Sequence, residues 1–151
     1  MRIKKDDIIW FMLGQFPWIV LALLFLAITI TSAFCQTVNQ DLLTELNSLR
    51  KTQLVYADDQ QISCDRWAKK ISTSYIHASH GFTGETIGAF IAVEQIIPAF
   101  MESKSHKKIL LDKRVRRVAI GIYVVPESTE VTKDGIIYNP KTYYTVIRTY
   151  Y

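Results

Sequence analysis

The stretch Val118-Ala119-Ile120-Gly121-Ile122-Tyr123-Val124 decides the fold class of this chain of 151 residues. Its larger aliphatic side chains stand at every second position, which is the period of a half-buried β-strand. Before this stretch, apolar residues recur at helical spacing, and after it the strand pattern continues. Because the pattern changes once, we predict an α+β domain in which helices pack on a small antiparallel sheet.

Two features continue the strand pattern toward the end of the sequence. Asp134-Gly135 is a turn signal typical of a β-hairpin, and it lies between Val131 and Ile136. Residues 144–149 alternate again and are rich in tyrosine, threonine, valine and isoleucine, which favour strands. We therefore expect a hairpin followed by a last strand.

Two helical segments are expected between residues 39 and 75. Asn39 would cap the first one, and the polar residues 58–61 would connect it to the second. Each segment carries an apolar face at helical spacing. The two faces consist of Leu42, Leu43, Leu46 and Leu49, and of Cys64, Trp67, Ala68, Ile71 and Tyr75.

Two further helices are expected between residues 93 and 111. Pro98 should kink or split the first of them, because proline has no N–H to donate and clashes with the preceding turn. Ser105 is the expected cap of a short helix through Leu110 and Leu111. The apolar face of the earlier helix consists of Val93, Ile96, Ile97 and Phe100.

Residues 1–35 have the composition of an export signal. Arg2, Lys4 and Lys5 precede a stretch without charge that runs from Ile8 to Gln40. A basic start, an apolar stretch and small residues near a cut are the order that a secretory signal needs. We predict cleavage after Cys35, with Ala33 three residues before the new N-terminus at Gln36, or alternatively cleavage after Ala33.

An uncleaved membrane anchor is the alternative for residues 1–35, because the uncharged stretch is long enough to span a bilayer. A lipoprotein signal at Cys35 is disfavoured, since Phe34 stands where a small residue is expected. The predicted organisation is a leader over residues 1–35 and one domain over 36–151.

Removal of the leader leaves Cys64 as the one cysteine and lowers the formal net charge from +4 to +3. A single cysteine forms no intrachain disulfide, and its place on an apolar helix face indicates a buried, inert thiol. The modest positive charge argues against nucleic-acid binding by an exported domain. A basic stretch nevertheless runs through Lys104, Lys107, Lys108, Lys113, Arg114, Arg116 and Arg117, and favours either a solvated face or anionic partners.

Five short motifs follow one another in the predicted domain, and each is weak alone. Together, in this order and at this spacing, they resemble the CAP superfamily of cysteine-rich secretory, plant pathogenesis-related and bacterial SCP-like proteins. The absence of a cysteine framework fits the bacterial branch. The motifs are LNSLR at 46–50, WAKK at 67–70, GETIG at 84–88, FMESKSHK at 100–107, and IGI at 120–122 with YYTV at 143–146.

The resemblance implies a three-layer α/β/α sandwich whose cleft is lined by histidines and acidic residues. By position, Glu85 matches the first glutamate of the family and His106 the second histidine. The first histidine is His77 or His80, with His77 slightly favoured by its spacing from Tyr75. The second glutamate is replaced by Ser103, as in bacterial relatives, so the family's set of four is incomplete. Residues 126–142 depart most from the family and are expected to form an extended hairpin.

Three functions follow from such a cleft. His77, Glu85 and His106 would be the ligands of a divalent metal such as zinc, although mutual hydrogen bonding of these groups is the preferred interpretation. Ser103 and His106 would be the catalytic pair of a secreted protease- or esterase-like hydrolase, but no orienting acid or oxyanion hole is evident. We therefore expect a noncatalytic extracytoplasmic module that binds lipid or a cell-envelope ligand and meets the membrane only through an uncleaved leader.

Overall fold

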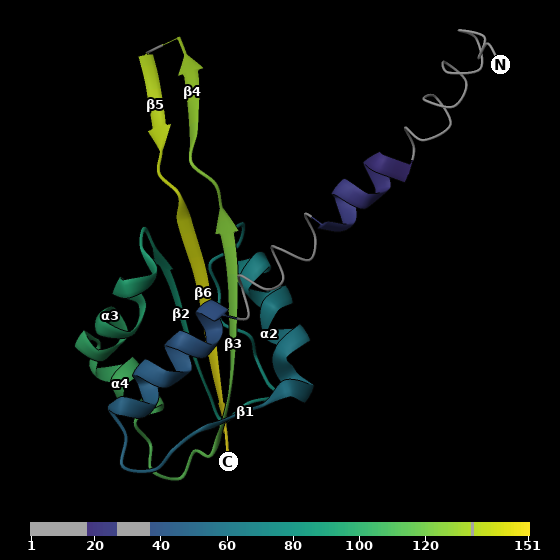
Figure 1. Ribbon diagram of the computed structural model, residues 1–151. Coiled ribbons are helices and arrows are strands. Elements are labelled where there is room, and N and C mark those ends of the chain that lie inside the picture. Colours follow the sequence, from purple (N-terminus) through teal and green to yellow (C-terminus); the bar gives the residue numbers. More distant parts are fainter. Residues whose placement is uncertain (1–17, 27–36, 134) are drawn as a thin grey trace, which may run out of the picture. The chain divides into compact units, whose positions relative to one another are not determined.

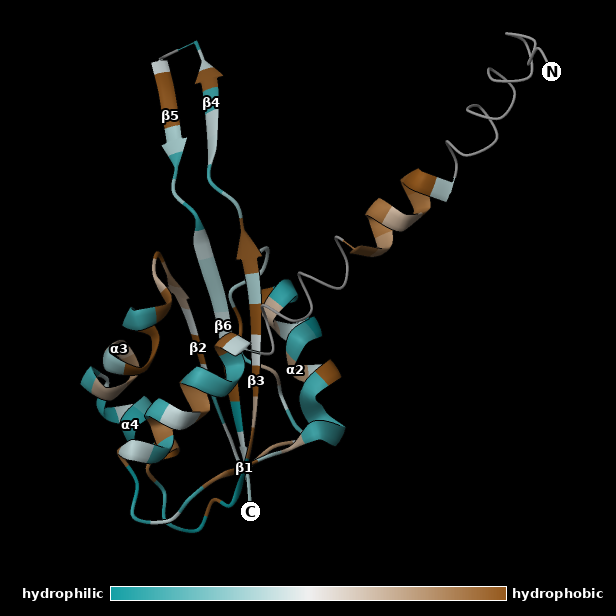
Figure 2. Cartoon of the chain, in the orientation of Figure 1, coloured by the Kyte–Doolittle hydropathy of each residue, from teal (hydrophilic) through white to brown (hydrophobic). Residues whose placement is uncertain are grey.

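The computed structural model describes residues 18–26, 37–133 and 135–151 (Figure 1). The chain divides into two compact units, Met1–Thr37 and Val38–Tyr151. In the first, residues 18–26 form an exposed, strongly hydrophobic helix (Figure 2). Within the described ranges, none of the helices combines the length and apolar character needed to cross a bilayer. Both predicted cleavage positions lie outside the described residues, so the leader stays a prediction.

The second unit is organised around a four-stranded sheet with the order β1-β3-β6-β2. Its long central strands are β3 (Arg117–Val125) and β6 (Thr142–Tyr150), which pair antiparallel, as do β6 and β2 (Gly84–Phe90). The short β1 (Val55–Tyr56) runs parallel to β3. The sheet is thus mixed at one edge, where an antiparallel sheet was expected.

A second, two-stranded sheet interrupts the connection from β3 to β6 (Figure 1). It consists of β4 (Ser128–Thr132) and β5 (Gly135–Asn139), with Val131 opposite Ile136. Gly135 has a φ of +138°, a conformation that side chains disfavour. The extended hairpin predicted for residues 126–142 is confirmed, while Asp134 itself lies outside the described residues.

One face of the four-stranded sheet is covered by three helical segments. They are the helix at residues 37–48, α3 (Ile96–Glu102) and α4 (Lys104–Leu110), with the 3₁₀ turn η1 (Val93–Gln95) before α3. Their apolar side chains pack with alternate residues of β3 and β6. The most deeply buried side chains of this core include Leu42, Leu46, Ile96, Ile97, Phe100, Leu110, Val118, Ile120 and Ile147.

The opposite face of the sheet is covered by α2 (Asp58–Ile71), which lies across β3 and β6 from the other helices in Figure 1. A Cβ atom on Gly121 would clash with the carbonyl group of Cys64, so glycine permits this close approach. Burial raises the pKa of the Cys64 thiol to about 12, which agrees with an inert buried cysteine. Helices on both faces give the predicted three-layer α/β/α sandwich.

Several helix boundaries differ from the sequence prediction. Asn39 is a buried helical residue rather than a cap, and Leu49 follows the helix and is exposed. Residues 58–61 are the first turn of α2 rather than a connection. Asp58 and Asp59 suit this position, because the helix dipole favours negative charge there. Tyr75 lies beyond the end of α2 instead of on its apolar face.

The capping prediction for α4 was also wrong. Ser103, not Ser105, occupies the N-cap position, and no side chain makes a capping hydrogen bond there. Pro98 is the third residue of α3, where its missing N–H costs little because the first turn has few intrahelical acceptors. The expected split therefore appears as the change from η1 to α3 before the proline.

Candidate functional site

Glu85 stands at the centre of a polar cluster on the α2 side of the sheet. One carboxylate oxygen accepts a hydrogen bond from Arg148 Nε at 2.7 Å, across the register pair that joins β2 and β6. The other oxygen accepts the backbone N–H of Ala78 at 2.8 Å and lies 3.1 Å from His77 Nδ1. Both oxygens of Glu85 are therefore engaged by protein groups.

Arg148 is held as firmly as its partner. Its side chain is 6% exposed and that of Glu85 is 1% exposed, so this is a buried ion pair. Arg148 also donates to Ser63 Oγ at 3.1 Å and lies between two rings, 5.0 Å from the centre of Phe82 and 5.5 Å from that of Trp67. Such a pair, with further hydrogen bonds and stacking, fixes the register of β2 on β6 and the position of the preceding loop.

The two candidate first histidines differ in their contacts. The His77 side chain is 54% exposed and reaches Glu85. His80 is exposed and its Nδ1 lies 2.7 Å from Ser79 Oγ, the hydroxyl of the preceding residue. Of these two, His77 is the one that contacts the buried carboxylate.

His106 and Ser103 belong to α4 and its N-cap, on the other side of β2. The His106 ring packs edge-on against Phe100, with centroids 5.2 Å apart. Partial burial, with a smaller contribution from the charge of His77, lowers the pKa of His106. Ser103 Oγ lies 3.1 Å from Ser105 Oγ, so its recorded hydrogen-bond partner is another hydroxyl rather than an imidazole.

A cleft of about 260 Å³ lies where these elements meet the edge strand β2. Its wall combines aliphatic and aromatic side chains with exposed polar atoms, and His106 and Ser103 are its side chains of catalytic type. The Tyr75 hydroxyl donates to the carbonyl of Ile87 at 3.2 Å and closes one side. The lining residues are Tyr75, Ile87, Gly88, Ala89, Phe90, Ala99, Phe100, Ser103 and His106. His77, His80 and Glu85 are not among them.

The proposed metal ligands do not fit a metal site. Over the described ranges, no group of three or more histidine, cysteine, aspartate or glutamate side chains is arranged to hold an ion. Glu85 already has an arginine and a backbone N–H on its oxygens, and His106 belongs to the cleft on the other side of β2. Glu85 and His77 thus contact each other, whereas His106 packs against Phe100.

The LNSLR motif turns out to be structural. Asn47 pairs with the backbone of Leu54, donating to its carbonyl at 3.1 Å and accepting its N–H at 2.8 Å. Arg50 donates to the carbonyls of Leu110, Asp112 and Val115, the last two at 2.9 and 3.1 Å. Arg50 thus joins the end of the first helix to the loop after α4.

The sequence reasoning missed Arg148 as the partner of Glu85. A signal was present in the sequence, since Arg148 alternates with Val146 and Tyr144 in the predicted last strand. A charged residue on the buried face of a strand requires a partner of opposite charge. The identity of that partner depends on the β2–β6 register, which sequence spacing alone does not provide.

No family model matches the chain, and no curated protein matches it. Solved structures do. An outer surface protein from Borrelia burgdorferi has a TM-score of 0.52 and 18% identity, over 76% of this chain and 92% of that one. MpPR-1i has a TM-score of 0.52 and 12% identity, over 78% of this chain and 87% of that one.

An extracellular protein containing an SCP domain from Bacillus anthracis also matches, with a TM-score of 0.52 and 12% identity. The match spans 77% of this chain but only 41% of that longer one. At such identities the likeness concerns the fold alone. The chain has the CAP-type, SCP-like α/β/α fold.

Proposed function

We propose that this protein is an extracytoplasmic, noncatalytic CAP-type module that binds an apolar or lipid-like ligand in the cleft beside β2. The observation that carries the proposal is the lining of this cleft, to which Tyr75, Ile87, Phe90 and Phe100 contribute apolar or aromatic side chains and His106 an imidazole. A concave, mostly apolar site with few polar groups is typical of small-molecule binding.

The export signal predicted for residues 1–35 supports the extracytoplasmic part of the proposal. Two of the structures with the same fold are described as an outer surface protein and as an extracellular protein. Both observations favour a location in the cell envelope or outside the cell.

Hydrolysis is the less favoured alternative. A Ser-His pair needs a hydrogen bond between nucleophile and base, and an acid that orients the base. Ser103 instead has Ser105 as its recorded partner, and the carboxylate of Glu85 is bonded to Arg148. Binding without chemistry requires neither arrangement.

Native mass spectrometry of the purified protein tests the proposal, because it detects retained lipid and bound metal together. We expect a retained apolar molecule that is reduced in His106→Ala and unchanged in His80→Ala, the exposed histidine outside the cleft. Panels of peptides and esters should show no turnover. Turnover that disappears in His106→Ala but persists in His80→Ala would establish the hydrolase instead. Equal ligand retention in both variants would show that the ligand does not bind in this cleft.

A further inference from the structure

The basic stretch at residues 104–117 contains cations in two different situations. Arg117 pairs with Asp59, Arg114 pairs with Asp112 at 2.7 Å, and Arg116 donates to the carbonyls of Lys113 and Val115. In contrast, Lys108 and Lys113 are exposed and have no acidic partner among the described residues. Within the described part of the stretch, the cations that have neither an acidic partner nor a carbonyl acceptor are therefore lysines.

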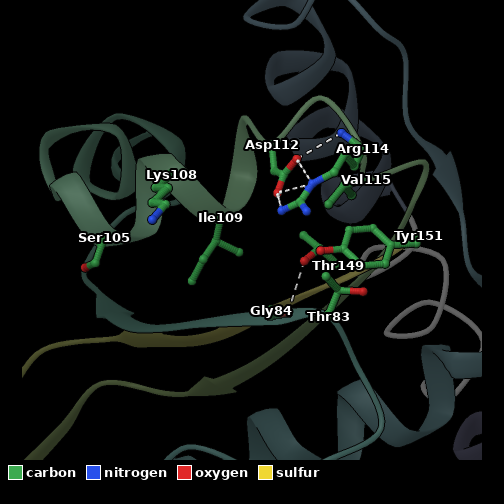
Figure 3. Close-up of a pocket in the computed structure, with 10 residues that line it drawn as sticks. All are labelled: Thr83, Gly84, Ser105, Lys108, Ile109, Asp112, Arg114, Val115, Thr149 and Tyr151. Atoms are coloured by element: carbon green, nitrogen blue, oxygen red, sulfur yellow. Dashed lines mark hydrogen bonds and ion pairs between the residues drawn. The ribbon is translucent and has the colours of Figure 1, made fainter.

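One of these lysines lines a cleft of about 360 Å³ between α4, the following loop and the ends of β2 and β6. In Figure 3, Lys108 and Ser105 lie toward one side, and Arg114 and Tyr151 toward the other, with Ile109 between them. The Arg114 guanidinium, held by Asp112 through two nitrogens, also lies 5.3 Å from the centre of the Tyr151 ring. The hydrogen bond from this guanidinium lowers the pKa of Asp112 to about 2.

A second cleft, of about 250 Å³, lies beside the same loop. It is lined by Leu49, Arg50, Lys51, Thr52, Leu111 and Lys113, with no acidic side chain among them. Successive residues of the loop line the two clefts in turn. Leu111 and Lys113 line the second cleft, and Asp112 and Arg114 line the first. Two positively charged hollows thus flank one short segment of chain.

We propose that these two clefts form a binding surface for a linear polymer that carries repeated phosphate groups. A single small anion would occupy one cleft, whereas a polymer crossing the 111–115 loop places one anionic group near Lys108 and another near Lys51 and Lys113. The guanidinium groups of Arg50 and Arg114, which would suit a carboxylate, are already bonded to carbonyls and to Asp112. The exposed cations that remain in the two clefts, Lys51, Lys108 and Lys113, are ammonium groups, which bind phosphate as point charges.

This surface is distinct from the apolar cleft of the proposed function. Ser103 and His106 line that cleft, while Ser105, Lys108 and Ile109 line the phosphate-polymer surface, and the two clefts share no lining residue. Failure of one proposal therefore leaves the other intact.

Fluorescence anisotropy with a short, end-labelled linear polyphosphate tests the surface on the purified protein. We expect Lys108→Ala and Lys113→Ala each to weaken binding by about fivefold, the usual effect of one surface lysine near dense negative charge. Lys133→Ala removes the same charge from the tip of the β4–β5 hairpin and should leave affinity unchanged. Binding should weaken steeply with added salt.

Four results would overturn the proposal. Equal losses in Lys108→Ala, Lys113→Ala and Lys133→Ala would indicate attraction to net charge alone. If inorganic phosphate displaced the probe at the same total phosphate concentration, a single phosphate would suffice for binding and the preference for a polymer would be excluded. If polygalacturonate bound as tightly as polyphosphate, the preference for phosphate over carboxylate would be excluded. If vesicles with anionic headgroups bound more tightly than polyphosphate, the ligand of this surface would be a membrane.

Discussion

Glu85 and Arg148 show how one pair of residues links the motif to the fold. Glu85 belongs to the GETIG motif, and Arg148 faces it from the neighbouring strand within a buried cluster. Charges buried in this way are costly when one partner is removed, because the other is left without compensation.

We expect Glu85→Ala to lower the free energy of unfolding by about 3–5 kcal/mol, since Arg148 would remain buried and unpaired. Urea denaturation followed by circular dichroism measures the change. Glu94→Ala, which removes an exposed glutamate in η1, is the matched control and should have little effect. An unchanged midpoint in Glu85→Ala would show that the pair does not stabilise the fold.

The same residues show what sequence reasoning reaches at this scale. Motif spacing pointed to Glu85 and His106 without indicating that they lie on different sides of β2. Arg50 was noticed as part of a motif, but its three carbonyl partners lie sixty or more positions away in the sequence. Contacts of this kind depend on how elements pack, and no local pattern encodes them.

At the scale of elements, α3 and α4 partly bury His106, and this burial makes the stability of the fold depend on pH. Burial, with the charge of His77 adding to it, lowers the pKa of His106 in the folded protein. The unfolded chain then binds the proton more readily than the folded one. The stability linked to His106 is therefore present above the ordinary pKa of histidine, and is lost as pH falls through the lowered pKa of the folded state.

We expect the urea concentration at the midpoint of unfolding to decrease when the pH is lowered from about 7.5 to about 5.5. The decrease should be smaller in His106→Gln, because the titrating group is gone. His80→Gln, at an exposed site, should follow the wild-type pH dependence. Urea titrations at the two pH values compare the three proteins. A pH dependence that His106→Gln leaves intact would assign the effect to other groups.

The β4–β5 hairpin is an element whose removal should hardly affect the rest of the domain. Val131, Ile136 and Tyr138 are 83%, 73% and 61% exposed, so they bury little apolar surface. Val125 and Thr142 are paired where the hairpin leaves the main sheet. We expect replacement of residues 126–141 by Asn-Gly to preserve the melting temperature within a few degrees, because a two-residue turn suits adjacent antiparallel strands.

Differential scanning calorimetry checks this replacement. A matched change in the core, Val146→Ala, should lower the melting temperature clearly because Val146 is fully buried. A comparable loss in the hairpin variant would mean that β4 and β5 stabilise the main sheet.

The elements themselves were largely predictable, and their ends were not. The alternation at residues 118–124 identified β3, and the Asp134-Gly135 signal identified the hairpin. The polar residues 58–61 were mistaken for a connection, because acidic residues suit both a loop and the first turn of a helix. The parallel β1 has only two residues, too few for a period to show.

At the scale of the whole molecule, the boundary between leader and domain decides whether the domain is released or stays attached to the membrane. The compact unit begins at Val38, which is itself buried, and Gln36 is the predicted first residue of the exported protein. Cleavage after Cys35 leaves every residue of this unit in place. A retained leader would instead keep the domain at the membrane by its apolar stretch.

We expect the protein recovered from outside the cytoplasm of an expressing bacterium to have the intact mass of residues 36–151. Because signal cleavage requires a small residue three positions before the cut, Ala33→Leu should block it and leave the precursor in the membrane fraction. Ala27→Leu makes the same change within the apolar stretch and should be processed normally. A mass that begins at Phe34 would place the cut after Ala33, and a full-length mass in the wild-type protein would establish the anchor.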